Sequence, residues 1–163
     1  MHAVKSLTPS FAVSPALGRE DFAAVRALGF ATVINFRPDN ESAEQISDMD
    51  ARRAAEAAGL AYVQIPVSKF DVFAEDVVKQ TAAALLSAPT PILAYCASGQ
   101  RAAMVWAAAA ARAKPVDTVL KALKSAGLDF GFLRDDLEAQ AGRKLWDEHA
   151  TYSSTVALPL VAA

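Results

Sequence analysis

Short apolar runs alternate with longer amphipathic segments along this chain. The longest runs are apolar at almost every position, which is typical of strands covered on both faces and not of strands with one face in water. The run ATVINF is also rich in β-branched residues, as strands are. Strands are therefore predicted at FAVSP (11–15), ATVINF (31–36), LAYVQIPV (60–67) and PILAY (91–95).

The segments between these runs have the spacing of amphipathic helices. In GREDFAAVRALG, Phe22, Val25 and Leu28 share one helical face, and Gly29 ends the helix. The final helix is weaker than the others, because Gly142 is expected to interrupt it. Besides this first helix, five more are expected, over residues 43–59, 74–88, 101–113, 115–127 and 132–150.

Strands that alternate with helices predict an α/β fold with a mostly parallel central sheet and helices on both faces. In such sheets the ligand site lies at the carboxyl ends of the strands. Cys96 stands at that end of the strand 91–95, at the start of a loop that leads into the helix 101–113. The loops RPDNES and SKFDVF follow the two preceding strands and bring Arg37 and Asp71 to the same edge.

Composition and charge narrow the class of protein. The 163 residues, 53% of them hydrophobic, predict a single domain (1–163) with a substantial core. The net charge of −2 gives no general attraction to nucleic acid or to an anionic membrane. No stretch reaches the ~18 apolar residues of a spanning helix, and MHAVKSLTPSFAV lacks the pattern of a secretory leader, so a cytoplasmic protein is expected. The single cysteine, Cys96, excludes an internal disulfide and a cysteine-rich metal site, and no metal or cofactor is expected.

The segment YCASGQR (95–101) joins an apolar strand to an alanine-rich helix. Amides near a helix N-terminus, together with the helix dipole, favour a thiolate over a thiol, and the thiolate is the nucleophile. Gly99 permits a turn that directs such amides inward, and Arg101 supplies a planar charged fork for a tetrahedral oxyanion. The alternative is that Cys96 is a small buried core residue. The residues expected to bind an oxyanion are Ala97, Ser98, Gly99, Gln100 and Arg101.

Four segments resemble the phosphatase-like domain of bacterial beta-lactamase-hydrolase-like proteins, a group within the tyrosine- and dual-specificity-phosphatase superfamily. They are GFATVINFRPDNE, AAEAAGLAYVQIPV, PILAYCASGQR and SAGLDF, in the order and spacing of that group, from about residue 6 to residue 130. The resemblance implies a central parallel sheet flanked by helices, with Cys96 as the nucleophile and Arg101 as the anion-binding arginine. Residues 131–163, a C-terminal helix and an apolar tail, lie beyond it.

The cysteine loop departs from the superfamily pattern. Superfamily phosphatases have five residues between the cysteine and the arginine, whereas four separate Cys96 from Arg101 here. The shorter loop is similar to that of rhodanese-type sulfurtransferases, and some members of the group carry that label. Ala102 lacks the hydroxyl that assists the departing thiolate in phosphatases, and Tyr95 stands where most of them have histidine.

A phosphatase also needs an acid that protonates the leaving alkoxide, usually an aspartate on a separate loop. Asp71 in SKFDVF is the first candidate, and its alternative role is that of a solvated loop or cap residue. Asp39 and Asp76 come next, although Asp76 is expected to be a first-turn acid of the following helix. Arg37 is a candidate for the edge of the anion site, and its alternative role is to pair with an acid and fix its loop.

Three functions remain open on these residues. The first is a phosphatase-like hydrolase that forms a covalent intermediate on Cys96, and the second is a sulfurtransferase that carries sulfane sulfur as a Cys96 persulfide. The third is a non-catalytic module that binds a small oxyanion. The substrate is accordingly a phosphoester, a sulfane-sulfur compound or another small anion. The apolar tail TYSSTVALPLVAA (151–163) is expected to dock in cis or on a neighbouring copy.

Overall fold

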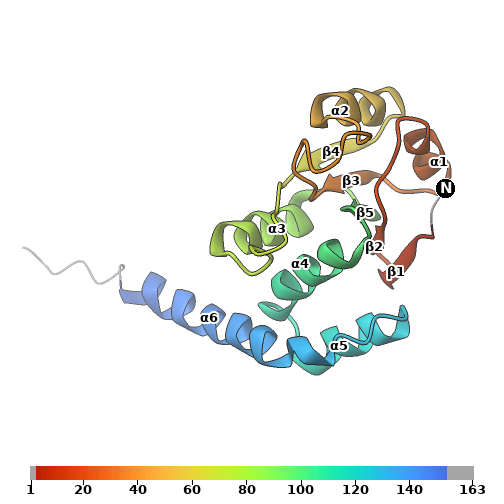
Figure 1. Cartoon of the computed structure of the whole chain (residues 1–163). Helices are drawn as coiled ribbons and strands as arrows, with labels where there is room; N and C mark the ends of the chain where they lie inside the picture. Colours follow the sequence, from red (N-terminus) through yellow and green to blue (C-terminus); the bar gives the residue numbers. More distant parts are fainter. Residues whose placement is uncertain (1–2, 154–163) are drawn as a thin grey trace, which may run out of the picture.

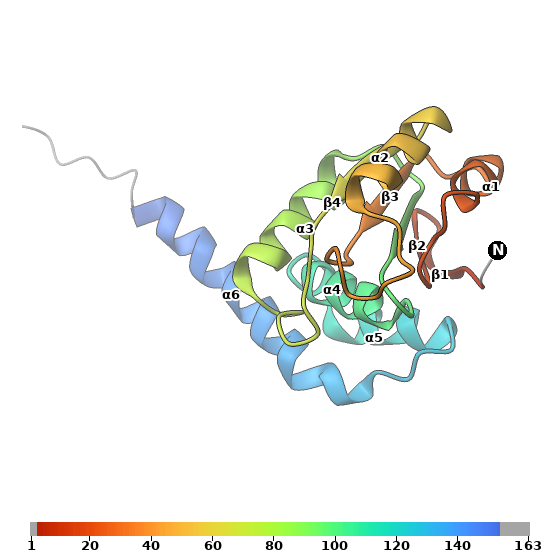
Figure 2. The same cartoon turned by 45° about the horizontal axis from the view of Figure 1, so that its top comes forward.

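The structure is a computed structural model that describes residues 3–153, and it is built on a five-stranded sheet with strand order β1-β2-β5-β3-β4 (Figures 1 and 2). Four strands run parallel, and β1 pairs antiparallel with β2 at one edge. The predicted α/β fold with a mostly parallel sheet is confirmed. The strands are β1 (Lys5–Thr8), β2 (Phe11–Ser14), β3 (Thr32–Asn35), β4 (Ala61–Gln64) and β5 (Ile92–Tyr95).

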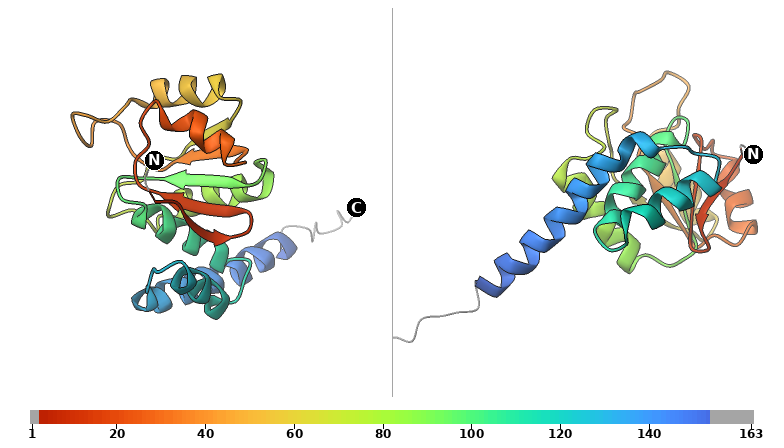
Figure 3. Two further views of the ribbon diagram at one scale, coloured as in Figure 1. Left: turned by 90° about the vertical axis from the view of Figure 1, so that its right-hand side faces the viewer. Right: turned by 90° about the horizontal axis from the view of Figure 1, so that it is seen from below.

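Helices cover both faces of the sheet (Figure 3). The first two lie on one face and the next two on the other, while the last two pack against α4 on its side away from the sheet. A short 3-10 turn, η1 (Gly131–Leu133), precedes the final helix. The helices are α1 (Asp21–Ala27), α2 (Asp48–Ala57), α3 (Glu75–Ser87), α4 (Gln100–Ala111), α5 (Val116–Ser125) and α6 (Arg134–Ser153).

Neighbouring residues of each central strand point to opposite faces of the sheet. Val33 and Leu93 belong to the core under α1 and α2, whereas Ile34 and Ala94 belong to the core against α3 and α4. All four side chains are fully buried. Because both faces are covered, the residues of β3 and β5 are buried on both sides of the sheet, including the polar Thr32 and Asn35 of β3.

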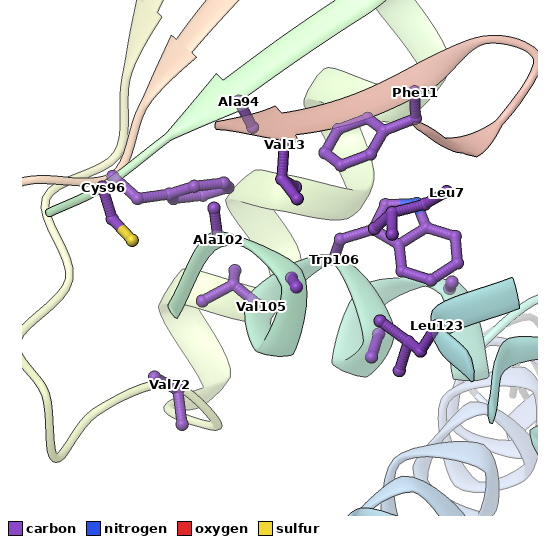
Figure 4. Packing of buried hydrophobic residues seen from close by; sticks show 14 of the residues in the cluster. Leu7, Phe11, Val13, Val72, Ala94, Cys96, Ala102, Val105, Trp106 and Leu123 are labelled. Atoms are coloured by element: carbon purple, nitrogen blue, oxygen red, sulfur yellow. The ribbon is translucent and has the colours of Figure 1, made fainter. Parts of the chain in front are cut away.

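The helix α4 packs closely against the central strands (Figure 4). Ten of its twelve residues are buried, most of them alanines, and the small side chains let α4 contact β2, α3, α5 and α6 together. Its largest buried side chain, Trp106, stacks on Phe11 of β2 with ring centroids 5.9 Å apart. Since α4 begins directly after the cysteine loop, this packing fixes the position of that loop.

The sequence pattern does not predict β1. Its four residues, KSLT, include one buried side chain, Leu7, and its pairing with β2 is irregular between Ser6 and Thr8. A polar edge strand of this length has no apolar period for sequence analysis to detect, because its pairing with β2 is what defines it.

The helix predicted over residues 43–59 starts later in the structure, at Asp48. The hydroxyl of Ser47 accepts a hydrogen bond from the Asp50 amide at 3.2 Å and caps the helix there. Residues 43–47 therefore extend the loop that follows β3 instead of forming a first helical turn.

The predicted interruption at Gly142 is wrong, because α6 runs continuously through that residue. Leu137 and Gln140 of α6 are buried, and Arg112 donates a hydrogen bond from Nη2 to Gln140 Oε1 at 2.9 Å. These contacts with α4 and the residue after it outweigh the ~1 kcal/mol that a glycine costs inside a helix.

The expectation that the tail 151–163 docks on a surface falls largely on residues 154–163, which lie outside the described residues. Within the part of the chain that the structure describes, no helix is both long enough and apolar enough to cross a membrane.

Candidate active site

Cys96 directly follows the central strand β5, which lies between β2 and β3. The residue is buried, with 1% of its surface exposed, and Figure 4 shows the thiol between the end of β5 and the first turn of α4. The sequence thus places its only cysteine at the carboxyl edge of the parallel strands, as expected. Burial alone would also suit a core residue, so the surrounding polar groups decide between the two interpretations.

Gly99 makes the turn that brings a backbone amide to the sulfur. Its φ of +89° lies in the left-handed region, and its amide donates a hydrogen bond to Cys96 Sγ at 3.1 Å. The turn is held from outside, because the amide of Ala16 donates to the Ala97 carbonyl at 3.2 Å. The sulfur thus accepts a hydrogen bond from a backbone amide at the N-terminus of a twelve-residue helix.

The other side chains of the loop make no hydrogen bond to the sulfur within the described residues. Ala97, Ser98 and Gln100 are exposed, and the Ser98 hydroxyl accepts a long hydrogen bond of 3.4 Å from the Gln100 amide. Ser98 therefore ties the loop together and does not bond to Cys96. Any oxyanion bound here would meet backbone amides of this loop, since Ala97 offers no polar side chain.

Arg101 is buried in the first turn of α4 and is held by two acceptors. Its Nη1 donates to Glu41 Oε1 at 2.7 Å and to the Val67 carbonyl at 2.9 Å. Within the described residues its Nε and Nη2 groups have no hydrogen-bond partner. The guanidinium is thus fixed on one side by the loops after β3 and β4 and retains three N–H donors for a ligand.

Glu41 lies between two arginines. Its second oxygen, Oε2, accepts a hydrogen bond from Arg37 Nε at 2.9 Å, so one carboxylate joins Arg37 to Arg101. Burial raises the pKa of Glu41, but the hydrogen bonds and charges of Arg101 and Arg37 outweigh this and bring its pKa below the usual range. The carboxylate therefore stays ionised, and the three side chains together carry one surplus positive charge.

Arg37 is positioned by the strand before it as well as by Glu41. Asn35 Oδ1 accepts from the Arg37 amide at 2.8 Å, and Asn35 Nδ2 donates to the Tyr62 hydroxyl at 2.9 Å. The Tyr62 hydroxyl in turn donates to Asp48 Oδ1 at 2.9 Å. The ion pair with Glu41 is the arrangement expected of an arginine that fixes its own loop.

Tyr95, which precedes the cysteine, is a buried aromatic residue and not a charged group at neutral pH. Burial raises the pKa of its hydroxyl to about 12. It belongs to the core under α1 and α2, on the face of the sheet opposite to the Cys96 side chain. Tyr95 therefore supports the loop by packing. The histidine that most superfamily phosphatases have at this position would supply a hydrogen bond or a charge instead.

Asp71 is exposed in the loop between β4 and α3. Its carboxylate accepts a hydrogen bond from the Ser68 hydroxyl, and it makes no hydrogen bond to Cys96 or Arg101, both of which the structure describes. The loop nevertheless begins beside the site, because the Val67 carbonyl binds Arg101.

Asp39 and Asp76, the two alternative candidates for the acid, also make no hydrogen bond to Cys96 or Arg101. Asp39 Oδ1 accepts a hydrogen bond from the Asp48 amide at 2.8 Å, and Asp76 is exposed in the first turn of α3. Among the described residues, no group of three or more His, Cys, Asp and Glu side chains is placed to hold a metal ion.

Comparison with known proteins identifies the family. The family model described as the phosphatase-like domain of beta-lactamase hydrolase-like protein matches residues 3–113, which include all five strands, the cysteine loop and α4. A beta-lactamase hydrolase-like protein of Agrobacterium fabrum is 37% identical over 82 residues, and one of Xylella fastidiosa is 29% identical over 104 residues. These alignments span 50% and 64% of this chain but only 19% and 24% of the two relatives, so the chain corresponds to a small part of those longer proteins.

Solved structures show the same fold. A candidate phosphatase from Neisseria meningitidis superposes with a TM-score of 0.73 at 28% identity and covers 86% of this chain and 99% of its own. A candidate phosphatase from Shewanella putrefaciens gives 0.61 at 20% identity, with 86% and 91% covered, and Tk-PTP in its active form gives 0.59 at 16%, with 84% and 94% covered. With the sheet, the cysteine loop and α4 all inside the matched range, the chain belongs to the family of beta-lactamase hydrolase-like protein phosphatase-like domains.

Proposed function

We propose that the chain is a cysteine-dependent phosphatase-like hydrolase that binds an oxyanion in the loop 97–101. The observation that carries this proposal is the hydrogen bond from the Gly99 amide to Cys96 Sγ, made at the N-terminus of α4 beside the fixed guanidinium of Arg101. A core cysteine has no need of an inward amide or of a buried arginine with free donors. A nucleophilic thiolate needs both.

The proposed reaction uses these groups in two steps. The Cys96 thiolate attacks phosphorus, an S–P bond forms, and the P–O bond to the leaving group breaks. The N–H donors of Arg101 and the loop amides stabilise the negative charge on the equatorial oxygens. Asp71 donates a proton to the leaving oxygen. Water then cleaves the S–P bond, which releases inorganic phosphate and returns the thiolate.

Turnover of an aryl phosphate by the purified protein tests this reaction. Cys96→Ser is expected to abolish turnover while the fold survives, and Ser87→Ala, at the exposed last residue of α3 outside the loop, is the control and should stay within a few-fold. Asp71→Asn is expected to reduce turnover by ~10²–10⁴, with a smaller loss for a good leaving group. Its matched control is Asp76→Asn. Full activity of Cys96→Ser overturns the proposal.

A second candidate function is sulfur transfer through a Cys96 persulfide. It is supported by the position of Asp71, which makes no hydrogen bond to Cys96 or Arg101. That carboxylate is exposed and bonded to Ser68, and sulfur transfer from thiosulfate needs no proton donor, because sulfite leaves as a stable anion. In this reaction the Cys96 thiolate attacks the outer sulfur, an S–S bond forms and sulfite departs. A thiol or cyanide then accepts the sulfur.

The two chemistries separate in parallel assays with an aryl phosphate and with thiosulfate plus cyanide. Asp71→Asn should impair only the phosphatase reaction, while Arg101→Ala should impair both. Mass spectrometry after thiosulfate treatment should reveal one added sulfur on Cys96 if transfer is the reaction. Anion binding without either turnover would identify a non-catalytic binding module instead.

A further inference from the structure

A groove of about 410 Å³ lies at the opposite end of the sheet from Cys96. Phe11 and Ile92, at the first positions of β2 and β5, form one wall, and the second halves of α3 and α4 form the others. Its volume is within the ~300–1,000 Å³ of pockets that take small ligands. The reaction proposed for Cys96 makes no use of it.

The groove is a deep hollow and not an apolar patch on a flat surface. Its floor is formed by Phe11, Ile92 and Trp106, which are at most 3% exposed although they line an open space. At its mouth lies Leu86 of α3, which is 90% exposed. A space that runs from an exposed mouth to a nearly buried floor can enclose a small molecule, whereas a docking face for another protein is broader and flatter.

The indole nitrogen of Trp106 is a hydrogen-bond donor without a partner at this floor. Trp106 stacks on Phe11 (Figure 4), but its Nε1 donates no hydrogen bond to any of the described residues. In the part of the chain that the structure describes, every fully buried side-chain nitrogen or oxygen has a partner, so this nitrogen reaches an open space, and the space that Trp106 lines is the groove. A buried indole N–H usually finds an acceptor. Here the acceptor has to be supplied by an occupant of the groove.

The described residues place no unpaired charge inside the groove. Arg112, at its margin, is neutralised by Glu75 of α3, with Nη2 2.7 Å from Oε2, and it also donates to Gln140 of α6. Lys114 is exposed at the margin, and no aspartate or glutamate of the described chain lines the groove. Moving a charged group from water into such an interior costs free energy that no partner offsets. The occupant that fits is therefore neutral, apolar over most of its surface, and a hydrogen-bond acceptor at one point.

We propose that the groove binds a small neutral molecule with an apolar body and one carbonyl or ether oxygen, and that this oxygen accepts a hydrogen bond from Trp106 Nε1. The apolar body lies against Ile92 of β5 and Leu85 of α3, which line the groove beside Trp106. This site is separate from the cysteine loop, and the proposal does not depend on the reaction at Cys96.

Acetophenone, ethylbenzene and benzoate, single-ring probes of nearly the same shape, test the proposal in the full chain. Titrations are followed by the nuclear magnetic resonance signal of the Trp106 indole proton, which is identified by removing the other tryptophan with Trp146→Phe. Acetophenone should shift this signal and bind roughly twofold to tenfold more tightly than ethylbenzene, which has no acceptor. Benzoate should bind more weakly than acetophenone, because its carboxylate is charged.

Trp106→Phe separates the hydrogen bond from the apolar contact. The variant removes the N–H and keeps an aromatic ring at the floor, so acetophenone should lose its advantage over ethylbenzene in titrations followed by the backbone amide signal of Ala109, which also lines the groove. An advantage of acetophenone that survives in the variant overturns the role of Trp106. In the wild type, ethylbenzene binding as tightly as acetophenone, or benzoate binding more tightly, contradicts the proposed class of ligand.

A matched pair of variants on α3 tests the location. Ala82 lines the groove, so Ala82→Phe should fill part of it and weaken acetophenone binding by about tenfold or more. Ala83, the next residue, is exposed and does not line the groove, so Ala83→Phe should leave the affinity unchanged. Equal binding by the two variants, or no binding of acetophenone to the wild type, overturns the proposal. A dimer in sedimentation that excludes acetophenone would also overturn it, because a second copy would then cover the groove.

Discussion

Replacing Gly99 with alanine should destabilise the fold and the cysteine loop together. Its φ is +89°, and an added Cβ would lie 3.1 Å from the carbonyl carbon and oxygen of Ser14 in β2. The left-handed conformation costs an alanine ~1–2 kcal/mol, and displacing the paired backbone of β2 costs ~1–3 kcal/mol more. Alanine also lowers the conformational entropy of the unfolded chain, which stabilises the protein by ~0.4–1 kcal/mol. The free energy of unfolding should therefore fall by about 2–4 kcal/mol.

Two other glycines separate these contributions. Gly59 has a φ of +77° with nothing within 4 Å of an added Cβ, so Gly59→Ala measures the backbone strain alone, about 0–1.5 kcal/mol after the unfolded-state term. Gly142 lies inside α6 with open space around it, and Gly142→Ala should stabilise the protein by ~0.5–1 kcal/mol.

Urea unfolding followed by tryptophan fluorescence measures all three variants. With a slope of ~2 kcal/mol per M, the Gly99→Ala midpoint should fall by about 1–2 M. Turnover should fall as well, because the Gly99 amide is the donor to Cys96 Sγ. A Gly99→Ala protein as stable as Gly59→Ala would refute the contact with Ser14 as the reason for glycine at this position.

Three further predictions concern charge and packing. Hydrogen bonding to Arg112 lowers the pKa of Glu75 to about 2. Because the group is partly exposed, Glu75→Gln should lower the free energy of unfolding by up to ~1 kcal/mol at pH 7. In urea unfolding, the difference between wild type and variant should shrink as the pH falls from 4.5 towards 2. Burial raises the pKa of Tyr95 to about 12, so its phenolate absorbance should appear at a higher pH than that of an ordinary tyrosine, in a titration compared with that of Tyr95→Phe. The contribution of Tyr95 to the free energy of unfolding should be lost as the pH rises from 10 to 12. Ile34→Val should cost ~0.5–1.5 kcal/mol by thermal unfolding, whereas Leu28→Ala, at an exposed position, should stay within ~0.5 kcal/mol.

The parallel part of the fold could be predicted because each central strand carries its own signal. Burial on both faces selects the apolar run ILAY in β5 and the buried pair Val33 and Ile34 in β3, and the helices between these strands have a regular apolar period. From there, the position of Cys96 at the carboxyl edge follows by topology. The edge strand β1 and the late start of α2 have no such signal, since a hairpin pairing and a serine cap define them.

The residues that hold Arg101 could not be found in this way. Glu41 lies 60 positions before Arg101 in the sequence, and the other acceptor, at Val67, is a backbone carbonyl that no side-chain motif marks. One local clue exists, because Glu41 stands four residues after Arg37 in FRPDNE and pairs with it. Only the fold brings that pair to the cysteine loop and turns a loop-fixing contact into part of the site.

The alanines of α4 reverse the usual meaning of a mutational scan. Alanine is the residue that a scan introduces, so an alanine scan would return almost no signal across the helix that seats the cysteine loop. A scan towards serine, valine or leucine would show the opposite, because each added atom has to push α4 away from β2, α3 or α6. The positions that look most dispensable by side-chain chemistry are then the least tolerant of change. Any loss of activity they cause would travel through a shift of the helix and not through a lost functional group.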